Sequence, residues 1–259
     1  PAVRVIRVDP AVHQELQRDG YLTRGPMGEY HGKNIGIRYA RGRFVACTNP
    51  DDVFSPALVR FLALRMLRSD SFYTTGIRFD TAWPDRFEDP DAYLTLLARR
   101  SLNDSLANDT EYNFAFGQRP EMNSLAVGAF GDVCEKGDVG NGKVSGYYDF
   151  YSGDFTLAAR SQWANVLGYP ELSWAFRVDS AVLCKFSGRG MRGVVLLPPC
   201  FVIHQHHTRT PHTLGFEDPE LLCNLMKKDA HARVHRSHRR PDLWGVWNSS
   251  VVTVSEVRP

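Results

Sequence analysis

The sequence predicts an α/β fold with a mostly parallel central sheet, and three observations support this prediction. Apolar and β-branched runs typical of strands alternate along the chain with amphipathic stretches typical of helices. A cap residue followed by proline, a signal for the first turn of a helix, occurs at Ser55-Pro56, Asp89-Pro90 and Asp218-Pro219. The 259 residues, 43% of them hydrophobic, can bury one large core, so we expect a single domain over residues 1–259.

The first part of the chain is predicted to hold three strands and two helices. Strands are favoured where β-branched and aromatic residues concentrate, at Val3–Val8, Phe44–Thr48 and Ser71–Phe79. Helices are favoured at Lys33–Ala40, which ends before Gly42, and from Ser55 to Met66, where leucines recur at helical spacing.

The second part continues this alternation around an irregular segment. Residues 103–148 carry recurring Gly, Asn and Asp and predict a long insertion. Further strands are expected at Phe155–Leu157, Val194–Leu197 and Phe201–His204. Further helices are expected at Asp89–Ser101, Arg160–Leu167, Asp179–Ser187 and from Asp218 to about Arg236.

Charge and hydropathy argue against two classes of partner. The net charge is +2 and the sequence pI is near 8.4, which gives no electrostatic reason to expect nucleic acid or a membrane surface as main partner. No apolar run approaches the roughly 20 residues that cross a bilayer, so we expect no membrane span.

The five cysteines stand singly in the sequence and form no CxxC pair. The simplest interpretation is a set of buried free thiols in a reducing compartment, such as the cytoplasm or an organelle interior, with disulfides as the alternative.

A polar segment, Asn49-Pro50-Asp51-Asp52, directly follows the strand predicted at Phe44–Thr48. Asn, Pro and Asp are ordinary turn and capping residues, so a plain strand-to-helix turn is one interpretation. The other is a cation site, because ligands of open α/β sheets bind beyond the carboxyl ends of strands. Hard divalent cations prefer such oxygen ligands and leave room for substrate phosphates.

Two further carboxylates open secondary-structure elements. Asp154 lies between Gly153 and an apolar strand, where a turn Asp that bonds its own backbone is the simpler interpretation. Asp179 opens an otherwise apolar helix, where Asp is a favoured N-cap. The functional alternative for Asp179 is a general base at a helix start.

Histidines gather in two places. The strand at Phe201–His204 ends in three imidazoles within four positions, and His204 with His207 could reach one metal centre. A second group, at positions 231, 235 and 238, lies among arginines on the predicted basic C-terminal helix. We interpret that helix as a solvated surface or a site of protein assembly.

These segments, in this order, resemble the family-2 type glycosyltransferases of the GT-A fold. The closest branch carries a KN-GI-RRARGEFVLATN-D-LFS core, which is similar to Lys33–Arg38, Ala40–Val45, Thr48–Asp51 and Phe54-Ser55 here. The branch also carries a GDFTL–W–LRGYPE segment, which resembles Gly153–Leu157, Trp163 and Leu167–Glu171 here. Its IDS segment resembles Val178–Ser180, and its YHIEH segment resembles Ile203–His207. Its closing Asn/Asp-x-Trp-Gly turn resembles Asp242–Gly245. The resemblance covers most of residues 3–66 and 150–248.

The resemblance implies a GT-A-like three-layer α/β/α fold that transfers a sugar. The donor would be a nucleotide-diphospho-sugar, the acceptor a glycan or other hydroxyl compound, and the cofactor Mn²⁺ or Mg²⁺. Asp51, His204 and His207 would hold the metal. Asn49 would belong to the DxD-like motif of this site, with Asp52 as a helper, and Lys33 and Arg38 would lie near the diphosphate. Asp179 would deprotonate the acceptor, and Asp154 would orient acceptor or donor sugar.

Two alternatives stay open at this stage. Such folds begin with two strand–helix units before the VRVI-like strand, so we expect those units on preceding sequence or another chain, or else a protein that no longer binds nucleotide. A protein that no longer binds nucleotide would be a non-catalytic subunit with a structural or interaction role in a larger assembly, and this is the first alternative to a transferase. The other alternative is a metallohydrolase that uses His204, His207 and a carboxylate.

Overall fold

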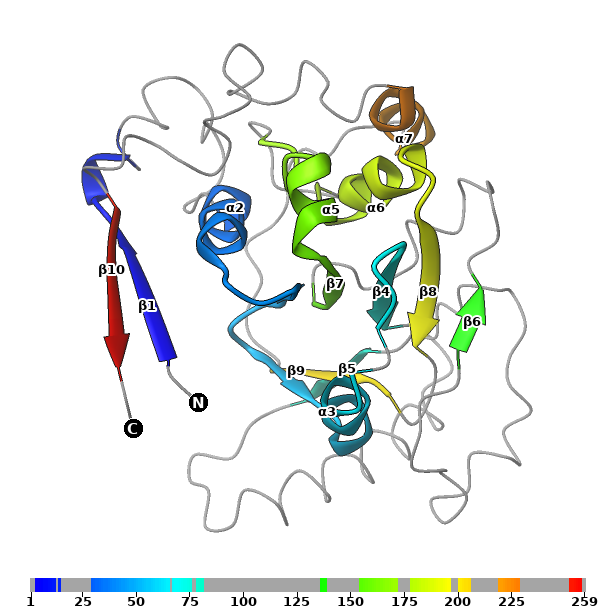
Figure 1. Cartoon of the computed structure of the whole chain (residues 1–259), viewed down its shortest axis with the longest axis horizontal. Helices are drawn as coiled ribbons and strands as arrows, with labels where there is room; N and C mark the ends of the chain where they lie inside the picture. Colours follow the sequence, from blue (N-terminus) through cyan, green and yellow to red (C-terminus); the bar gives the residue numbers. More distant parts are fainter. Residues whose placement is uncertain are drawn as a thin grey trace. The chain divides into compact units, whose positions relative to one another are not determined.

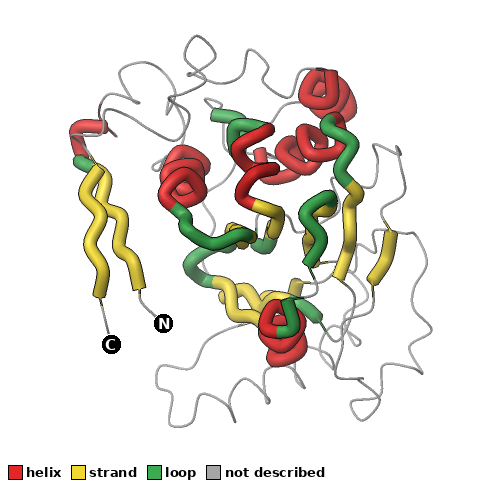
Figure 2. The backbone as a smooth tube through the Cα atoms, viewed as in Figure 1, coloured by secondary structure: helices red, strands yellow, loops and turns green. Residues whose placement is uncertain are grey.

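The computed structural model describes residues 3–12, 14, 29–65, 67–75, 78–81, 136–138, 154–171, 178–196, 200–205, 219–228 and 252–257 (Figures 1 and 2). The chain divides into two compact units. The first contains residues 1–45, 160–189 and 212–259, and the second contains residues 46–159 and 190–211. The described part combines helices with mixed sheets, which is an α/β architecture.

The larger sheet is built around a fully buried strand, β4 (Ser71–Thr75). The strand order is β2 (Phe44–Cys47), β7 (Thr156–Ala159), β4, β8 (Arg192–Leu196) and β6 (Lys136–Asp138). The division between the two units falls within β2. Strands β4 and β8 run parallel, as the alternating pattern predicts, but β7 is antiparallel to β4 and β6 is antiparallel to β8.

The expected predominance of parallel pairing is therefore not found among the strand pairs described in this sheet, which is mixed. The physical reason lies in the burial of the strands. A strand that is buried on both faces has a continuous apolar sequence whichever way its neighbour runs, so the pattern does not reveal direction.

The smaller sheet of the second unit has the order β3 (Asp52–Phe54), β9 (Val202–Gln205) and β5 (Arg78–Thr81). Strand β9 is antiparallel to β3 and parallel to β5. The sequence prediction missed β3, and it joined β4 and β5 into one strand at 71–79. The three residues of β3 are too few for a periodic signal, because a single apolar–polar alternation is not distinguishable from a turn.

Ser55 connects this small sheet to the helix that follows it. The helix α3 (Pro56–Ala63) starts with the predicted cap, because the Ser55 hydroxyl accepts a hydrogen bond from Leu58 N–H at 3.2 Å. The same hydroxyl accepts from Phe201 N–H at 3.2 Å, and Ser55 N–H donates to the Phe201 carbonyl at 3.1 Å. One residue thus caps the helix and holds the start of β9 beside the end of β3.

Among the residues that the structure describes, the first unit includes a two-stranded ribbon and several helices. Strands β1 (Val3–Val8) and β10 (Val252–Val257) pair antiparallel over six residues. The predicted β1 is confirmed, and β10 was not predicted. These helices include α2 (Glu29–Tyr39), α5 (Arg160–Asn165), α6 (Val178–Gly188) and α7 (Pro219–Lys228).

The core of the first unit includes Trp163 of α5, which is completely buried. Its ring packs against Tyr169 and Phe186, with ring centroids 5.2 and 4.9 Å away. Its indole N–H donates to the Val45 carbonyl at 3.1 Å, which satisfies the polar atom of a buried aromatic residue. The apolar and aromatic residues that predicted α5 and α6 therefore meet in one cluster.

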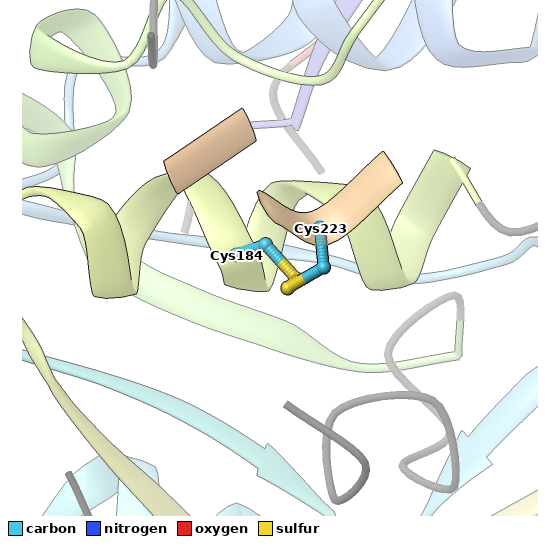
Figure 3. The surroundings of a disulfide bond; sticks show 2 residues. All are labelled: Cys184 and Cys223. Carbon is cyan, nitrogen blue, oxygen red and sulfur yellow. A yellow bond between two sulfur atoms is a disulfide. The ribbon is translucent and has the colours of Figure 1, made fainter. Parts of the chain in front are cut away.

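Helices α6 and α7 pack closely and are joined by a disulfide between Cys184 and Cys223 (Figure 3). A Cβ at Gly188 would lie 2.6 Å from the Lys227 carbonyl oxygen, so the close approach requires glycine there. The predicted helices at Asp179–Ser187 and from Asp218 are confirmed where the structure describes them. The helix predicted at 89–101, most of the 103–148 insertion and residues 229–240 lie outside the described residues.

The disulfide corrects the expectation of free thiols. Cys184, Cys200 and Cys223 are disulfide-bonded, whereas Cys47 is a buried thiol. The expected reducing compartment loses its basis, because disulfides form and persist in oxidising environments. The sequence did not reveal the pairing because Cys184 and Cys223 are 39 residues apart and meet only through helix packing.

Within the described residues, no helix combines the length and the hydropathy needed to cross a bilayer.

Candidate metal centre

Strand pairing in the small sheet of the second unit brings an imidazole to the polar segment at 49–52. In the antiparallel register of β3 and β9, Asp52 lies directly opposite His204. His204 Nε2 is 3.2 Å from Asp51 Oδ2. Asp51, Asp52 and His204 each offer one ligand atom, and these atoms all lie within 4.8 Å of one another. Two carboxylates and an imidazole thus converge on one point.

The two oxygens of the Asp52 carboxylate have different surroundings. Oδ2 accepts hydrogen bonds from Asn49 N–H at 3.1 Å and from the Thr48 hydroxyl at 3.3 Å. Oδ1 is buried, and among the residues that the structure describes no donor reaches it. A buried acceptor without a donor is costly, unless a cation or another ligand satisfies it.

The electrostatics of the cluster disfavour a bare negative charge. Burial, and after it the negative charges of Asp154 and Asp51, together raise the pKa of the Asp52 carboxyl from 3.8 to about 7, against the hydrogen bonds from Asn49 and Thr48, which lower it. Carboxylates gathered in this way repel one another until a positive charge joins them. A bound cation would reverse the local balance and favour the ionised form of Asp52.

Asp154 joins the same cluster from the other sheet of the second unit. It lies just before β7 and is 3% exposed, and its Oδ1 accepts a hydrogen bond from Asn49 Nδ2 at 2.9 Å. The next residue, Phe155, makes an edge-on contact with Phe54 of β3, with ring centroids 5.4 Å apart. The structure therefore brings Asn49, Asp51, Asp52, Asp154 and His204 together in one unit, all of which the sequence singled out.

The donor set fits a divalent cation of intermediate hardness. Carboxylate oxygens suit Mg²⁺ and Mn²⁺ alike, whereas an imidazole nitrogen is a poor ligand for Mg²⁺ and a good one for transition metals. His204 is buried on β9, and its position is set by backbone pairing on both sides, with Asp52 of β3 and with Asp80 of β5. The Oδ1 atom of Asp52, which no hydrogen-bond donor among the described residues reaches, supplies a further oxygen ligand.

Three other predicted residues lie in the first unit, and their roles stay predictions. Lys33 of α2 pairs with Glu29 at 2.7 Å, and its ammonium lies over the rings of Tyr30 and Tyr169. Arg38 lies in the last turn of α2. Asp179 lies in the first turn of α6, where it also complements the helix dipole. The remaining predicted ligand, His207, lies outside the described residues.

Sequence reasoning missed two polar positions. Thr48, whose hydroxyl donates to Asp52 Oδ2, was predicted only as the end of a strand. A hydroxyl four residues before an Asp, with a proline turn between them, could have indicated this contact. Asn34 was noted only as part of the resembling core. Its amide donates to the Tyr169 carbonyl and to Glu171, and its oxygen accepts from Tyr169 N–H at 2.7 Å. Asn34 therefore ties α2 to the turn after α5.

No family model matches this chain, and a search of curated proteins finds no match either.

Proposed function

We propose that this chain is a metal-dependent glycosyltransferase of GT-A-like, three-layer architecture that uses a nucleotide-diphospho-sugar donor. One observation carries the proposal: a polar segment at a strand end and a histidine on a later strand place two carboxylates and an imidazole around one point. This is the combination that the sequence resemblance assigns to the cation site of such transferases.

The cation is proposed to be Mn²⁺ rather than Mg²⁺, because of the imidazole in the donor set. Asp51, His204 and the Oδ1 atom of Asp52 would hold it. When bound, such a cation neutralises the diphosphate leaving group, which is the main electrostatic task in this type of transfer. Asn49 and Thr48 keep Asp52 oriented by donating to its other oxygen.

The transfer itself needs an acid–base group. In the proposed reaction the acceptor oxygen forms a bond to the anomeric carbon while the bond from that carbon to the diphosphate oxygen breaks. The acceptor hydroxyl proton passes to a carboxylate, for which Asp179 is the candidate from the sequence resemblance. Lys33 and Arg38 are candidates for charge contacts with the diphosphate, and Asp154 for orienting acceptor or donor sugar.

The proposal is tested by calorimetric titration of the full chain with Mn²⁺, and then with uridine diphosphate in the presence and absence of Mn²⁺. We expect Mn²⁺ to bind and the nucleotide to bind only with Mn²⁺ present. Asp51→Ala should abolish both. Asp70→Ala is the matched control, because it removes an exposed carboxylate from the same unit, where Asp70 pairs with Arg68.

A folded wild-type chain that binds no Mn²⁺ would overturn the proposal and favour a non-catalytic subunit. Where Mn²⁺ binds, a panel of uridine and guanosine diphospho-sugars is incubated with hydroxyl acceptors, and product is detected by mass spectrometry. Metal-dependent hydrolysis of simple esters without any nucleotide sugar would instead indicate a metallohydrolase built on the same ligands.

A further inference from the structure

Asn49 bridges two carboxylates of the second unit. Its side-chain amide donates to Asp154 Oδ1 at 2.9 Å, and its backbone N–H donates to Asp52 Oδ2 at 3.1 Å. Asp154 and Asn49 are 105 residues apart in the sequence, so only the tertiary structure makes this link. The two hydrogen bonds hold the side chain and the backbone of Asn49 at the same time, so the bridge restricts the position of this residue.

The bridge has a direct consequence for Asp52. Because Asn49 N–H and the Thr48 hydroxyl both donate to Oδ2, the carboxylate cannot rotate freely, and Oδ1 is the oxygen left for a ligand. The orientation of the Asn49 backbone thus decides where Oδ1 lies. The side chain of Asn49 is held by Asp154, which is buried and lies beside β7, a strand of the larger sheet.

The packing beside this bridge favours a fixed position for Asp154. Phe155, the next residue, is completely buried against Phe54, which lies two residues after Asp52 in β3. The polar link from Asp154 to Asn49 and the aromatic contact from Phe155 to Phe54 therefore hold both ends of the segment that carries Asp51 and Asp52. Two contacts at the two ends of a short segment restrict its position more than either contact alone.

We propose that Asp154 is a positioning residue for the cation, which acts by holding Asn49 and, through Asn49, the Asp52 carboxylate. This inference rests on the metal centre of the proposed function and adds a role for Asp154 beyond orienting a sugar. Outer contacts of this kind commonly change metal affinity by about 10- to 100-fold when they are removed. The contact works through its hydrogen bond, so it requires an acceptor oxygen at position 154.

The test is a double-mutant cycle on the full chain, read as the Kd for Mn²⁺ alone by calorimetry. Asp154→Ala and Asn49→Ala should each weaken Mn²⁺ binding by about 10-fold or more. The double variant should be no weaker than the weaker single variant, because both changes remove the same contact. Asp154→Asn keeps an acceptor oxygen in place and should retain the wild-type Kd within about threefold.

Two results would overturn the inference. Equal losses from Asp154→Ala in the wild-type and the Asn49→Ala backgrounds would show that Asp154 acts on the cation without Asn49. A Kd for Asp154→Asn as weak as that for Asp154→Ala would show that its charge, and not the hydrogen bond, matters.

Folding is checked for every variant by thermal melting. If Asp154→Ala does not fold, the cycle pairs Asn49→Ala with Asp154→Asn, and further loss in that double variant counts against the inference. The experiment also separates the two proposals. Absence of Mn²⁺ binding by the wild type rejects the metal centre itself, whereas wild-type binding with unchanged variants rejects only the role of Asp154.

Discussion

His204 of β9 lies opposite Asp52 of β3 in antiparallel register, and its Nε2 atom is 3.2 Å from the carboxylate of the preceding residue, Asp51. This relationship places a nitrogen donor beside two oxygen donors on a small three-stranded sheet. It follows from backbone pairing, because residues opposite each other in a sheet carry neighbouring side chains. The register of one strand pair therefore determines the composition of the candidate metal centre.

The first prediction concerns metal selectivity. His204→Ala removes the only nitrogen donor of the cluster formed with Asp51 and Asp52, so affinity for Mn²⁺ should fall by about 10- to 100-fold. Affinity for Mg²⁺, which prefers oxygen ligands, should fall much less. Calorimetric titrations of wild type and variant with both ions measure the ratio. Equal losses for the two ions would show that His204 is not a ligand.

The second prediction concerns the pH dependence of stability. Burial and the nearby charges of Asp154 and Asp51 raise the pKa of Asp52 from 3.8 to about 7, so the folded state binds a proton more tightly than the unfolded state. The resulting stability is fully present below pH 3.8 and is lost as pH rises through about 7. Asp52→Asn, which stays neutral, should therefore stabilise the metal-free chain at pH 8 by about 1–2 kcal/mol after allowance for partial exposure.

Thermal melting of wild type and Asp52→Asn at pH 5 and pH 8, with chelator present, measures this effect. The variant should melt a few degrees higher at pH 8, and the difference should shrink at pH 5, where the wild-type carboxyl is mostly protonated. The same variant should lose Mn²⁺ binding. A variant that is less stable than wild type at both pH values would contradict the raised pKa of Asp52.

The third prediction concerns protons released when metal binds. With a pKa of about 7, the Asp52 carboxyl is mostly protonated at pH 6 and mostly ionised at pH 8, and only the ionised form is a good ligand. Mn²⁺ binding should release about 0.9 proton from this group at pH 6 and about 0.1 at pH 8. Calorimetry in buffers of different ionisation enthalpy measures the release, and a value that does not change with pH would argue against Asp52.

The fourth prediction concerns Ser55, which caps α3 and accepts from Phe201 N–H. Ser55→Ala leaves two buried backbone donors without their acceptor, so the free energy of unfolding should fall by about 1–3 kcal/mol. Urea denaturation measures this loss. Ser161→Ala is the matched control, because Ser161 is exposed on α5 and its loss should stay within about 0.5 kcal/mol. Equal effects of the two substitutions would show that the Ser55 hydroxyl does not stabilise the small sheet.

The fifth prediction concerns the disulfide between α6 and α7. Replacing both Cys184 and Cys223 by Ala opens a loop of about 39 residues, so stability should fall by about 2–4 kcal/mol. The double variant is preferable to a reductant, because Cys200 is also disulfide-bonded. Peptide mapping of the native chain under non-reducing conditions should recover the Cys184–Cys223 link. Recovery of both residues as free thiols would instead support the expectation of unpaired cysteines.

Local patterns determined most of the elements in the described part of the chain. Alternation predicted β1, the cap at Ser55 and Pro56 predicted α3, and the apolar run after Asp179 predicted α6. These signals succeed because each depends on residues only a few positions apart, whose backbone preferences and burial show in the sequence. The same local signals identified Asp51, Asp52, Asp154 and His204 as candidates for chemistry.

Only the tertiary structure decided which of these candidates belong together. The opposition of Asp52 and His204, the hydrogen bond from Asn49 to Asp154 and the link from Cys184 to Cys223 all join segments that are distant in the chain. Such contacts depend on strand register and helix packing, which a local pattern does not encode. The sequence therefore determined the chemical groups, and the fold determined their distances, their burial and the raised pKa of Asp52.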